Sequence, residues 1–154
     1  MRPPYLQRWP EICYAHARRA GPAGHVAAPG VGIAIVKTIL VVDDEEAVVE
    51  FIGSLLEEED YRILRAYDGR SALEIARNEH PDLILSDIMM PIMNGLEFCR
   101  QLRETPETAD IPVILMTAGR STDHACPGAT VLPKPFDLNT LEEVVARKLA
   151  EPTP

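Results

Sequence analysis

Acidic residues stand where two apolar runs of the sequence end. Asp87 closes the run 83–87, and the pair Asp43 and Asp44 directly follows the run 38–42. Short runs of this kind, rich in β-branched residues, are typical of parallel strands that are buried on both faces. Because the carboxyl ends of neighbouring parallel strands build the ligand site of an open sheet, we expect the three acidic side chains to share one site.

Two further apolar runs bring a hydroxyl and an amine to the same edge. The run 111–116 ends in Thr117, and the short run 131–132 leads almost at once into Lys134. A threonine or lysine taken alone is usually a solvent-exposed surface residue. The order of all five residues at strand ends argues against that explanation, and it predicts a site for a divalent metal and a phosphoryl group.

The expected chemistry follows from the charge of this cluster. Two carboxylates 4 Å apart repel by roughly 4 kcal/mol at an effective dielectric constant of about 20, so protons or a cation must neutralise them. Oxygen ligands without His or Cys favour a hard ion, and Mg²⁺ is the best match. With that charge neutralised, one carboxylate can attack phosphorus. We expect Asp87 to be this nucleophile because it stands alone, whereas Asp43 and Asp44 are adjacent and better placed to hold metal.

The elements that must position these residues alternate between strand and helix patterns. Apolar spacings of three and four residues predict amphipathic helices, and Asp137 is a good N-cap for the last of them. The helices are expected over 45–59, from 69 through 76, from 95 to the Thr105-Pro106 region and from 137 through 149. Five strands and at least four helices fit one doubly wound α/β domain with a parallel sheet.

Composition and charge exclude several other classes of protein. Residues 1–37 carry five Arg or Lys against one acid (+4), and residues 38–154 carry ten against twenty-three (−13). A domain this acidic repels nucleic acid, so we expect no direct binding to it. No apolar run approaches the roughly 18–20 residues that cross a bilayer, so we expect no membrane association. Cysteines without a disulfide pattern favour free thiols in a reducing cytoplasm, so we expect a cytoplasmic location.

The N-terminal segment shows no pattern that predicts a folded element, and the cysteines show none that predicts a disulfide or a metal site. Residues 1–36 are rich in Arg, Pro, Gly and Ala, and we expect a disordered extension, or a misassigned start with translation beginning near Val36. Cys13, Cys99 and Cys126 are odd in number and far apart, so neither a disulfide framework nor a zinc site is indicated. We expect three free thiols.

The local motifs are more specific than the spacing. Residues 38–150 resemble the receiver domain of two-component response regulators. The resemblance rests on four segments, namely 39–45 (ILVVDDE), 87–95 (DIMMPIMNG), 116–118 (MTA) and 134–136 (KPF). It implies a flavodoxin-like, doubly wound five-stranded parallel sheet with strand order 2-1-3-4-5. The domain would span residues 37–150, with a tail at 151–154.

The resemblance also implies a role for each site residue. Asp87 would be the phosphoacceptor, charged from a phosphohistidine on a sensor histidine kinase or a phosphotransfer protein. Asp44 and Asp87 would bind Mg²⁺ directly, with the backbone carbonyl of Met89 as a third ligand and Asp43 acting largely through water. Thr117 and Lys134 would be the switch hydroxyl and the site lysine. A cis peptide is expected before Pro135.

Three features depart from the family pattern. Val131 stands where most receivers have an aromatic residue, and its stiff side chain has no ring that can relocate. The interval from Thr117 to Lys134 is about five residues shorter than usual, roughly one and a half helical turns. We therefore expect the fourth helix to be short or missing. Met89 and Gly119 offer no polar group to orient a water, which predicts slow self-dephosphorylation.

Three functions fit these residues. The first is a single-domain, phosphorylation-controlled binding module that signals to an unknown effector protein and is not an enzyme. The second is a receiver fragment of a longer regulator or hybrid kinase. The third is a small Mg²⁺-dependent phosphatase with an aspartyl-phosphate intermediate, which needs an acid two residues after the nucleophile, where this chain has Met89.

Overall fold

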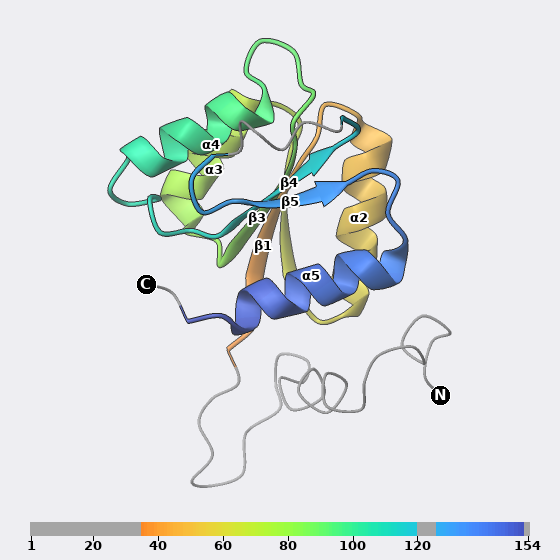
Figure 1. The fold of residues 1–154 in the computed structure, drawn as a ribbon. Helices are drawn as coiled ribbons and strands as arrows, with labels where there is room; N and C mark the ends of the chain where they lie inside the picture. The colour runs from red at the N-terminus through yellow and green to blue at the C-terminus, as the bar shows by residue number, and fades with distance from the viewer. Residues whose placement is uncertain (1–34, 120–125, 153–154) are drawn as a thin grey trace, which may run out of the picture.

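The computed structural model describes residues 35–119 and 126–152. Strands and helices alternate as far as residue 117, as the sequence predicts, and a strand and a helix follow residue 126 (Figure 1). The elements are β1 (Thr38–Val42), α2 (Glu46–Glu58), β2 (Arg62–Ala66), α3 (Gly69–Glu79), β3 (Leu83–Asp87), α4 (Gly95–Glu104), β4 (Val113–Thr117), β5 (Thr130–Pro133) and α5 (Leu138–Ala150). The predicted bounds differ from these by one to three residues at most ends.

The five strands form one parallel sheet in the order β2-β1-β3-β4-β5. This order confirms the expected doubly wound, flavodoxin-like fold. Val42 pairs with Ser86, and Asp87 pairs with Met116 on the neighbouring strand. The pairing places the carboxyl ends of β1, β3 and β4 side by side at one edge of the sheet, so the polar residues at those ends become neighbours.

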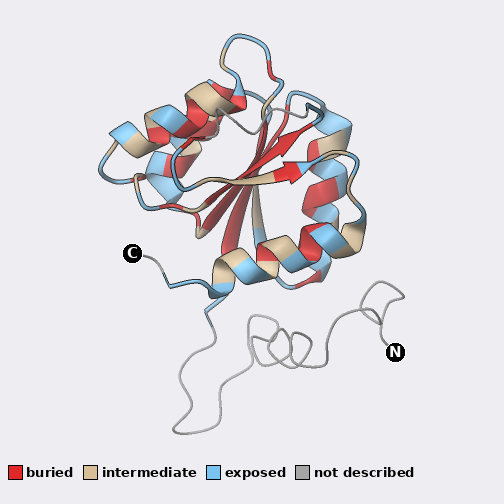
Figure 2. Cartoon of the chain, viewed as in Figure 1, coloured by how far each residue is buried: buried red, intermediate tan, exposed pale blue. Residues whose placement is uncertain are grey.

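The sheet separates two apolar layers, because alternate residues of each strand point to opposite faces. On one face, α3 and α4 cover a core that includes Leu40, Ile84 and Leu115. On the other face, α2 and α5 cover a core that includes Ile39 and Leu85. Figure 2 shows the buried strands between these two pairs of helices. Burial on both faces explains why β1, β3 and β4 read as continuous apolar runs.

Side-chain caps fix where three of the helices begin. Asp68, Asn94 and Asp137 each accept a hydrogen bond from the backbone N–H three residues later, at 2.8, 2.9 and 2.8 Å. The caps satisfy amide donors that have no partner inside the helix. The prediction that Asp137 starts the last helix is confirmed.

The connection between β4 and β5 is short. Its described residues, 118–119 and 126–129, form bends and turns without a helix, while residues 120–125 lie outside the described part. Thus four helices, not five, accompany the five strands in the described residues, as expected from the short interval. The predictions for the N-terminal extension fall on residues 1–34, which are also outside the described part, as is Cys13. No helix among the described residues has the length and hydropathy to cross a membrane.

The expectation of three free thiols is wrong for two of them. Cys99, on α4, and Cys126, before β5, form a disulfide with a Cα–Cα distance of 6.0 Å. The two cysteines are 27 residues apart in the sequence. The crossover from α4 through β4 returns the chain to the same face of the sheet, and this return brings the two side chains together in one apolar cluster.

Candidate functional site

Three carboxylates meet at the carboxyl edge of the sheet. Asp43 and Asp44 follow β1, and Asp87 is the last residue of β3. One oxygen from each of these side chains lies within 4.8 Å of the others. Asp43 and Asp87 are buried while Asp44 is exposed, so the cluster lies at the surface with two of its members set into the fold.

The amine and the hydroxyl reach the same edge. Lys134 Nζ lies 2.9 Å from Asp87 Oδ1, and this ion pair is the direct contact between the lysine and the acidic cluster. The backbone N–H of Lys134 donates to the carbonyl of Thr117 at 2.7 Å, which ties the end of β5 to the end of β4. Thr117 Oγ1 accepts a hydrogen bond from Gly119 N–H at 3.0 Å. All five residues singled out in the sequence therefore occupy one edge of the sheet.

The electrostatics of the cluster affect Asp43 most. Burial raises the pKa of Asp43 to about 6, and the negative charge of Asp87 adds to this shift. The hydrogen bond from Glu45 N–H, 3.0 Å from Asp43 Oδ1, opposes it. Burial of a carboxylate disfavours its charged form, and a second carboxylate nearby acts in the same direction.

The donor set fits a hard divalent cation. The three residues offer carboxylate oxygens, without His or Cys in the group. Mg²⁺ prefers such oxygen ligands and keeps several of its waters. A bound cation would also offset the repulsion between the Asp43 and Asp87 carboxylates, which contributes to the raised pKa of Asp43.

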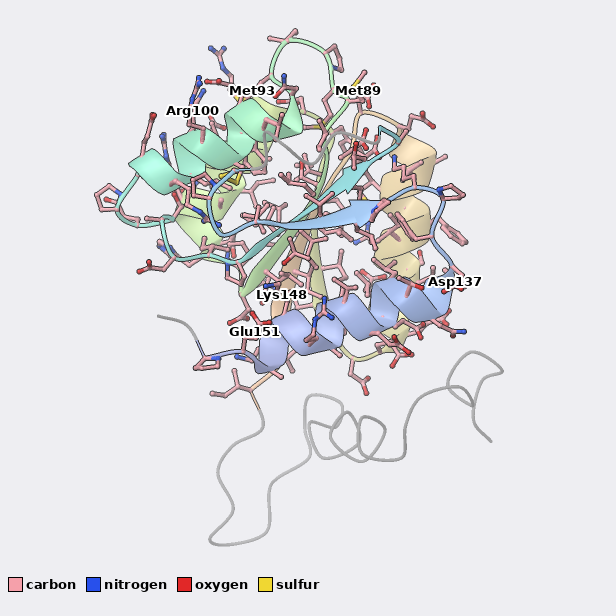
Figure 3. All side chains as sticks on the ribbon, in the orientation of Figure 1. Met89, Met93, Arg100, Asp137, Lys148 and Glu151 are labelled. Atoms are coloured by element: carbon pink, nitrogen blue, oxygen red, sulfur yellow. A yellow bond between two sulfur atoms is a disulfide. The ribbon has the colours of Figure 1, made fainter. Side chains whose placement is uncertain are left out.

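The loop between β3 and α4 closes over the backbone of Asp87. Gly95, the first residue of α4, donates its N–H to the carbonyl of Ile88 at 2.9 Å. A Cβ at this glycine would lie 2.3 Å from the carbonyl oxygen of Asp87, so only glycine fits. Met89, labelled in Figure 3, lies on the exposed part of this loop.

The structure also shows the peptide bond before Pro135 and the position of Val131, the two features of β5 and its end that the family pattern singled out. The peptide bond between Lys134 and Pro135 is cis, as expected. Val131 is half-buried on β5, in register with Leu115 of β4.

Sequence reasoning missed two features near the site. The close approach of Gly95 to Asp87 was not predicted, although the glycine in the motif 87–95 was a signal for it. The disulfide between Cys99 and Cys126 was also missed, because two cysteines 27 residues apart in the sequence do not reveal a pairing. Figure 3 draws disulfides as yellow bonds.

Curated relatives of this chain are response regulators. Response regulator MprA of Mycolicibacterium vanbaalenii is 42% identical over 117 residues, which cover 73% of this chain and 48% of the relative. The chain thus spans about half the length of the curated relatives it matches.

Solved structures similar to this chain include a response regulator and a receiver domain. The chemotaxis response regulator CheY4 of Vibrio cholerae is 29% identical, with a TM-score of 0.69 over 74% of this chain and 99% of that chain. The receiver domain of sensor histidine kinase PA1611 from Pseudomonas aeruginosa PAO1, solved with a magnesium ion in its active site cleft, is 25% identical. Its TM-score is 0.68, over 76% of this chain and 100% of that chain.

The sequence also matches the response regulator receiver domain family over residues 39–146. This match spans most of the chain and includes all five residues of the acidic edge, namely Asp43, Asp44, Asp87, Thr117 and Lys134. Receiver domains are signalling domains of two-component systems. The chain belongs to the response regulator receiver domain family.

Proposed function

We propose that this receiver accepts a phosphoryl group on Asp87 from a phosphohistidine of a sensor histidine kinase or a phosphotransfer protein. The position of the Asp87 carboxylate carries the proposal, because it lies 2.9 Å from Lys134 Nζ and within 4.8 Å of oxygens from Asp43 and Asp44. A fixed ammonium beside an incoming phosphoryl group stabilises the charge that develops during transfer.

The same residues define a binding site for Mg²⁺. We assign Asp44, Asp87 and the backbone carbonyl of Met89 as direct ligands, and Asp43 as a ligand acting through water. The magnesium ion in the PA1611 receiver supports this assignment. When bound, Mg²⁺ would neutralise phosphoryl oxygens that the carboxylates would otherwise repel.

Thr117 would report the phosphorylation to the rest of the domain. Its hydroxyl accepts a hydrogen bond from Gly119 N–H. A phosphoryl group adds nearly two negative charges and three strong acceptor oxygens, so the hydroxyl would gain by donating to one of them. This rearrangement would bias the backbone that follows Thr117 and Val131. A valine at position 131 has no ring to relocate, so the response would depend on this backbone rather than on an aromatic rotamer.

The message would pass through protein contacts that depend on phosphorylation. We propose residues 37–150 as the receiver unit, residues 1–36 as an extension and residues 151–154 as a tail. The kinase or phosphotransfer protein and the effector would be cytoplasmic partners, and no nucleic acid would be bound directly by this acidic unit. The unit would act alone or as part of a longer regulator, and the mass of the native protein on an immunoblot distinguishes the two.

The phosphoryl group should be lost slowly. Met89 and Gly119 flank the site, and neither side chain can orient a water for attack on the phosphoryl group. We expect a half-life well above seconds for the purified protein, measured by intact mass after removal of the phosphodonor. A half-life of seconds would contradict this reasoning.

The experiment that tests the function is labelling with a small acyl phosphate in the presence of Mg²⁺. The wild-type protein should gain the mass of one phosphoryl group, and a chelator should abolish the gain. Asp87→Asn should gain none. Asp110→Asn is a matched control, because this exposed acid lies before β4, at the opposite end of that strand from Thr117. Labelling of Asp87→Asn at the wild-type level would refute the proposal.

A further inference from the structure

The Cys99–Cys126 disulfide joins the two elements that support the proposed phosphoryl site. Cys99 lies on α4, four residues after Gly95, and Gly95 packs against the backbone of Asp87. Cys126 begins the turn that leads into β5, and β5 ends directly before Lys134. The disulfide therefore joins α4, which packs against the backbone of Asp87, to the segment that leads through β5 to Lys134.

A second tie connects the same two elements without a covalent bond. Arg103 lies four residues after Cys99, and therefore on the same side of α4. Its Nε donates to the carbonyl of Pro127 at 3.0 Å, and its Nη1 donates to the carbonyl of Ile111 at 2.8 Å. These bonds do not need the disulfide. They would keep the turn near α4 after reduction, though less rigidly than the crosslink does, so the two thiols would stay close enough to reoxidise.

The two sulfurs differ in access. Cys99 is fully buried, whereas Cys126 is 7% exposed and precedes the exposed residues Pro127 and Gly128. Both cysteines are buried, and Cys126 is the nearer of the two to solvent, so we expect exchange with an incoming thiol to begin at Cys126. An outer sulfur of this kind, paired with an inner one, is an arrangement that permits thiol–disulfide exchange.

We propose that the Cys99–Cys126 pair is a reversible redox crosslink whose state sets the affinity of the Asp87 site for a phosphoryl group. The proposal rests on the function proposed above. In the crosslinked form the Asp87 and Lys134 side chains have the 2.9 Å spacing seen in the structure, so the site is preorganised. In the dithiol form α4 and β5 are joined only by noncovalent contacts, and ordering the site costs part of the binding energy.

Formation of the Cys99–Cys126 disulfide requires an oxidant, and a disulfide compound such as oxidised glutathione can serve. The thiolate of Cys126 attacks one sulfur of this compound, which forms a mixed disulfide and releases one thiol. Cys99 then attacks the Cys126 sulfur and releases the second thiol. The protein pair loses two protons and two electrons, and the disulfide compound becomes two thiols. Reduction by an excess of thiol reverses both steps.

Coupling between two sites in one domain typically changes affinity by fivefold or more. We expect the disulfide form to bind beryllofluoride, a phosphoryl analogue, about fivefold more tightly than the dithiol form in the presence of Mg²⁺. Linkage is reciprocal, so bound analogue should lower the reduction potential of the pair by about 20 mV, since a tenfold change corresponds to about 30 mV for two electrons.

The test uses the full chain carrying Cys13→Ser, which leaves one possible intramolecular pair. Calorimetry measures beryllofluoride binding with Mg²⁺ to the oxidised and the reduced protein, and peptide mapping without reductant verifies the 99–126 link. In Cys126→Ser, binding should match the reduced form under both conditions. If this variant fails to fold by circular dichroism, the comparison of oxidised with reduced parent protein decides alone.

Three outcomes separate the claims. A fivefold difference that the variant removes supports the proposal. Equal affinities within about twofold, or no 99–126 link after oxidation, overturn it and leave the proposed function intact. If neither form binds the analogue and neither is labelled by an acyl phosphate, the proposed function fails and this inference fails with it.

Discussion

The carboxyl group of Glu59, at the end of α2, should make the stability of this domain depend on pH. Glu59 is 3% exposed, and neither of its carboxylate oxygens has a hydrogen-bond partner among the described residues. Burial raises the pKa of Glu59 from 4.5 to about 7, and the charge of Glu142, a buried residue of α5, adds to the shift. The folded state therefore holds this proton at pH values where the unfolded chain has released it.

The sign and the size follow from linkage. Because the folded protein binds more protons than the unfolded chain between the two pKa values, the free energy of unfolding falls as the pH rises from about 4.5 to about 7. The shift is worth at most about 3.5 kcal/mol, at about 1.4 kcal/mol per pKa unit. Between pH 5 and pH 8 we expect a loss of about 2 to 3 kcal/mol from this group alone.

Urea unfolding of Glu59→Gln against the wild type measures this contribution. The variant should be more stable than the wild type by about 3 kcal/mol at pH 8 and by less than about 1 kcal/mol at pH 5. The raised pKa of Asp43 gives a loss of the same sign, so only the difference between the two proteins isolates Glu59. Glu74→Gln, at an exposed acid of α3 that is not among the charges raising the pKa of Glu59, is the control and should follow the wild type. A Glu59→Gln curve parallel to the wild type across the pH range would refute the reasoning.

Three further predictions concern the site and its supports. Lys134→Ala should slow labelling by an acyl phosphate about 100-fold or more, because it removes the cation beside the Asp87 carboxylate; a rate within threefold of the wild type, by intact mass over time, would contradict this role. Gly95→Ala should cost about 1–3 kcal/mol in urea unfolding, since its Cβ would lie 2.3 Å from the Asp87 carbonyl; unchanged stability would show that the backbone yields. Cys126→Ser should lower the stability of the oxidised protein by about 3–4 kcal/mol, from the chain entropy of a 27-residue separation; equal midpoints of the oxidised and reduced wild type would contradict it.

The strand ends of the acidic site were predictable because burial on both faces leaves a clear pattern. Continuous apolar runs predicted β1 and β3. The acidic residues that follow or end these runs were predicted to meet at the carboxyl edge of the sheet, and Asp43, Asp44 and Asp87 lie together there. Element bounds were less certain. The run 111–116 predicted a strand, but β4 covers Val113–Thr117, because Ile111 and Pro112 precede the ladder.

Contacts between elements far apart in the sequence could not be predicted in this way. Periodicity shows which face of α4 is buried but not which residue of the β4–β5 connection lies against it, so the pairing of Cys99 with Cys126 was missed. The buried carboxyl of Glu59 was missed as well. In the sequence it stands in an acidic run, 57–60, that is typical of a solvent-exposed helix end.

The most direct test of the central claim is the position of the acyl phosphate. Borohydride reduces an aspartyl phosphate to homoserine and leaves a free carboxylate unchanged, so peptide sequencing by mass spectrometry after labelling with acyl phosphate and Mg²⁺ reads the modified residue. The account predicts homoserine at position 87 and at no other aspartate. Homoserine at Asp43 or Asp44, or its absence from every peptide of a fully covered digest, would contradict it.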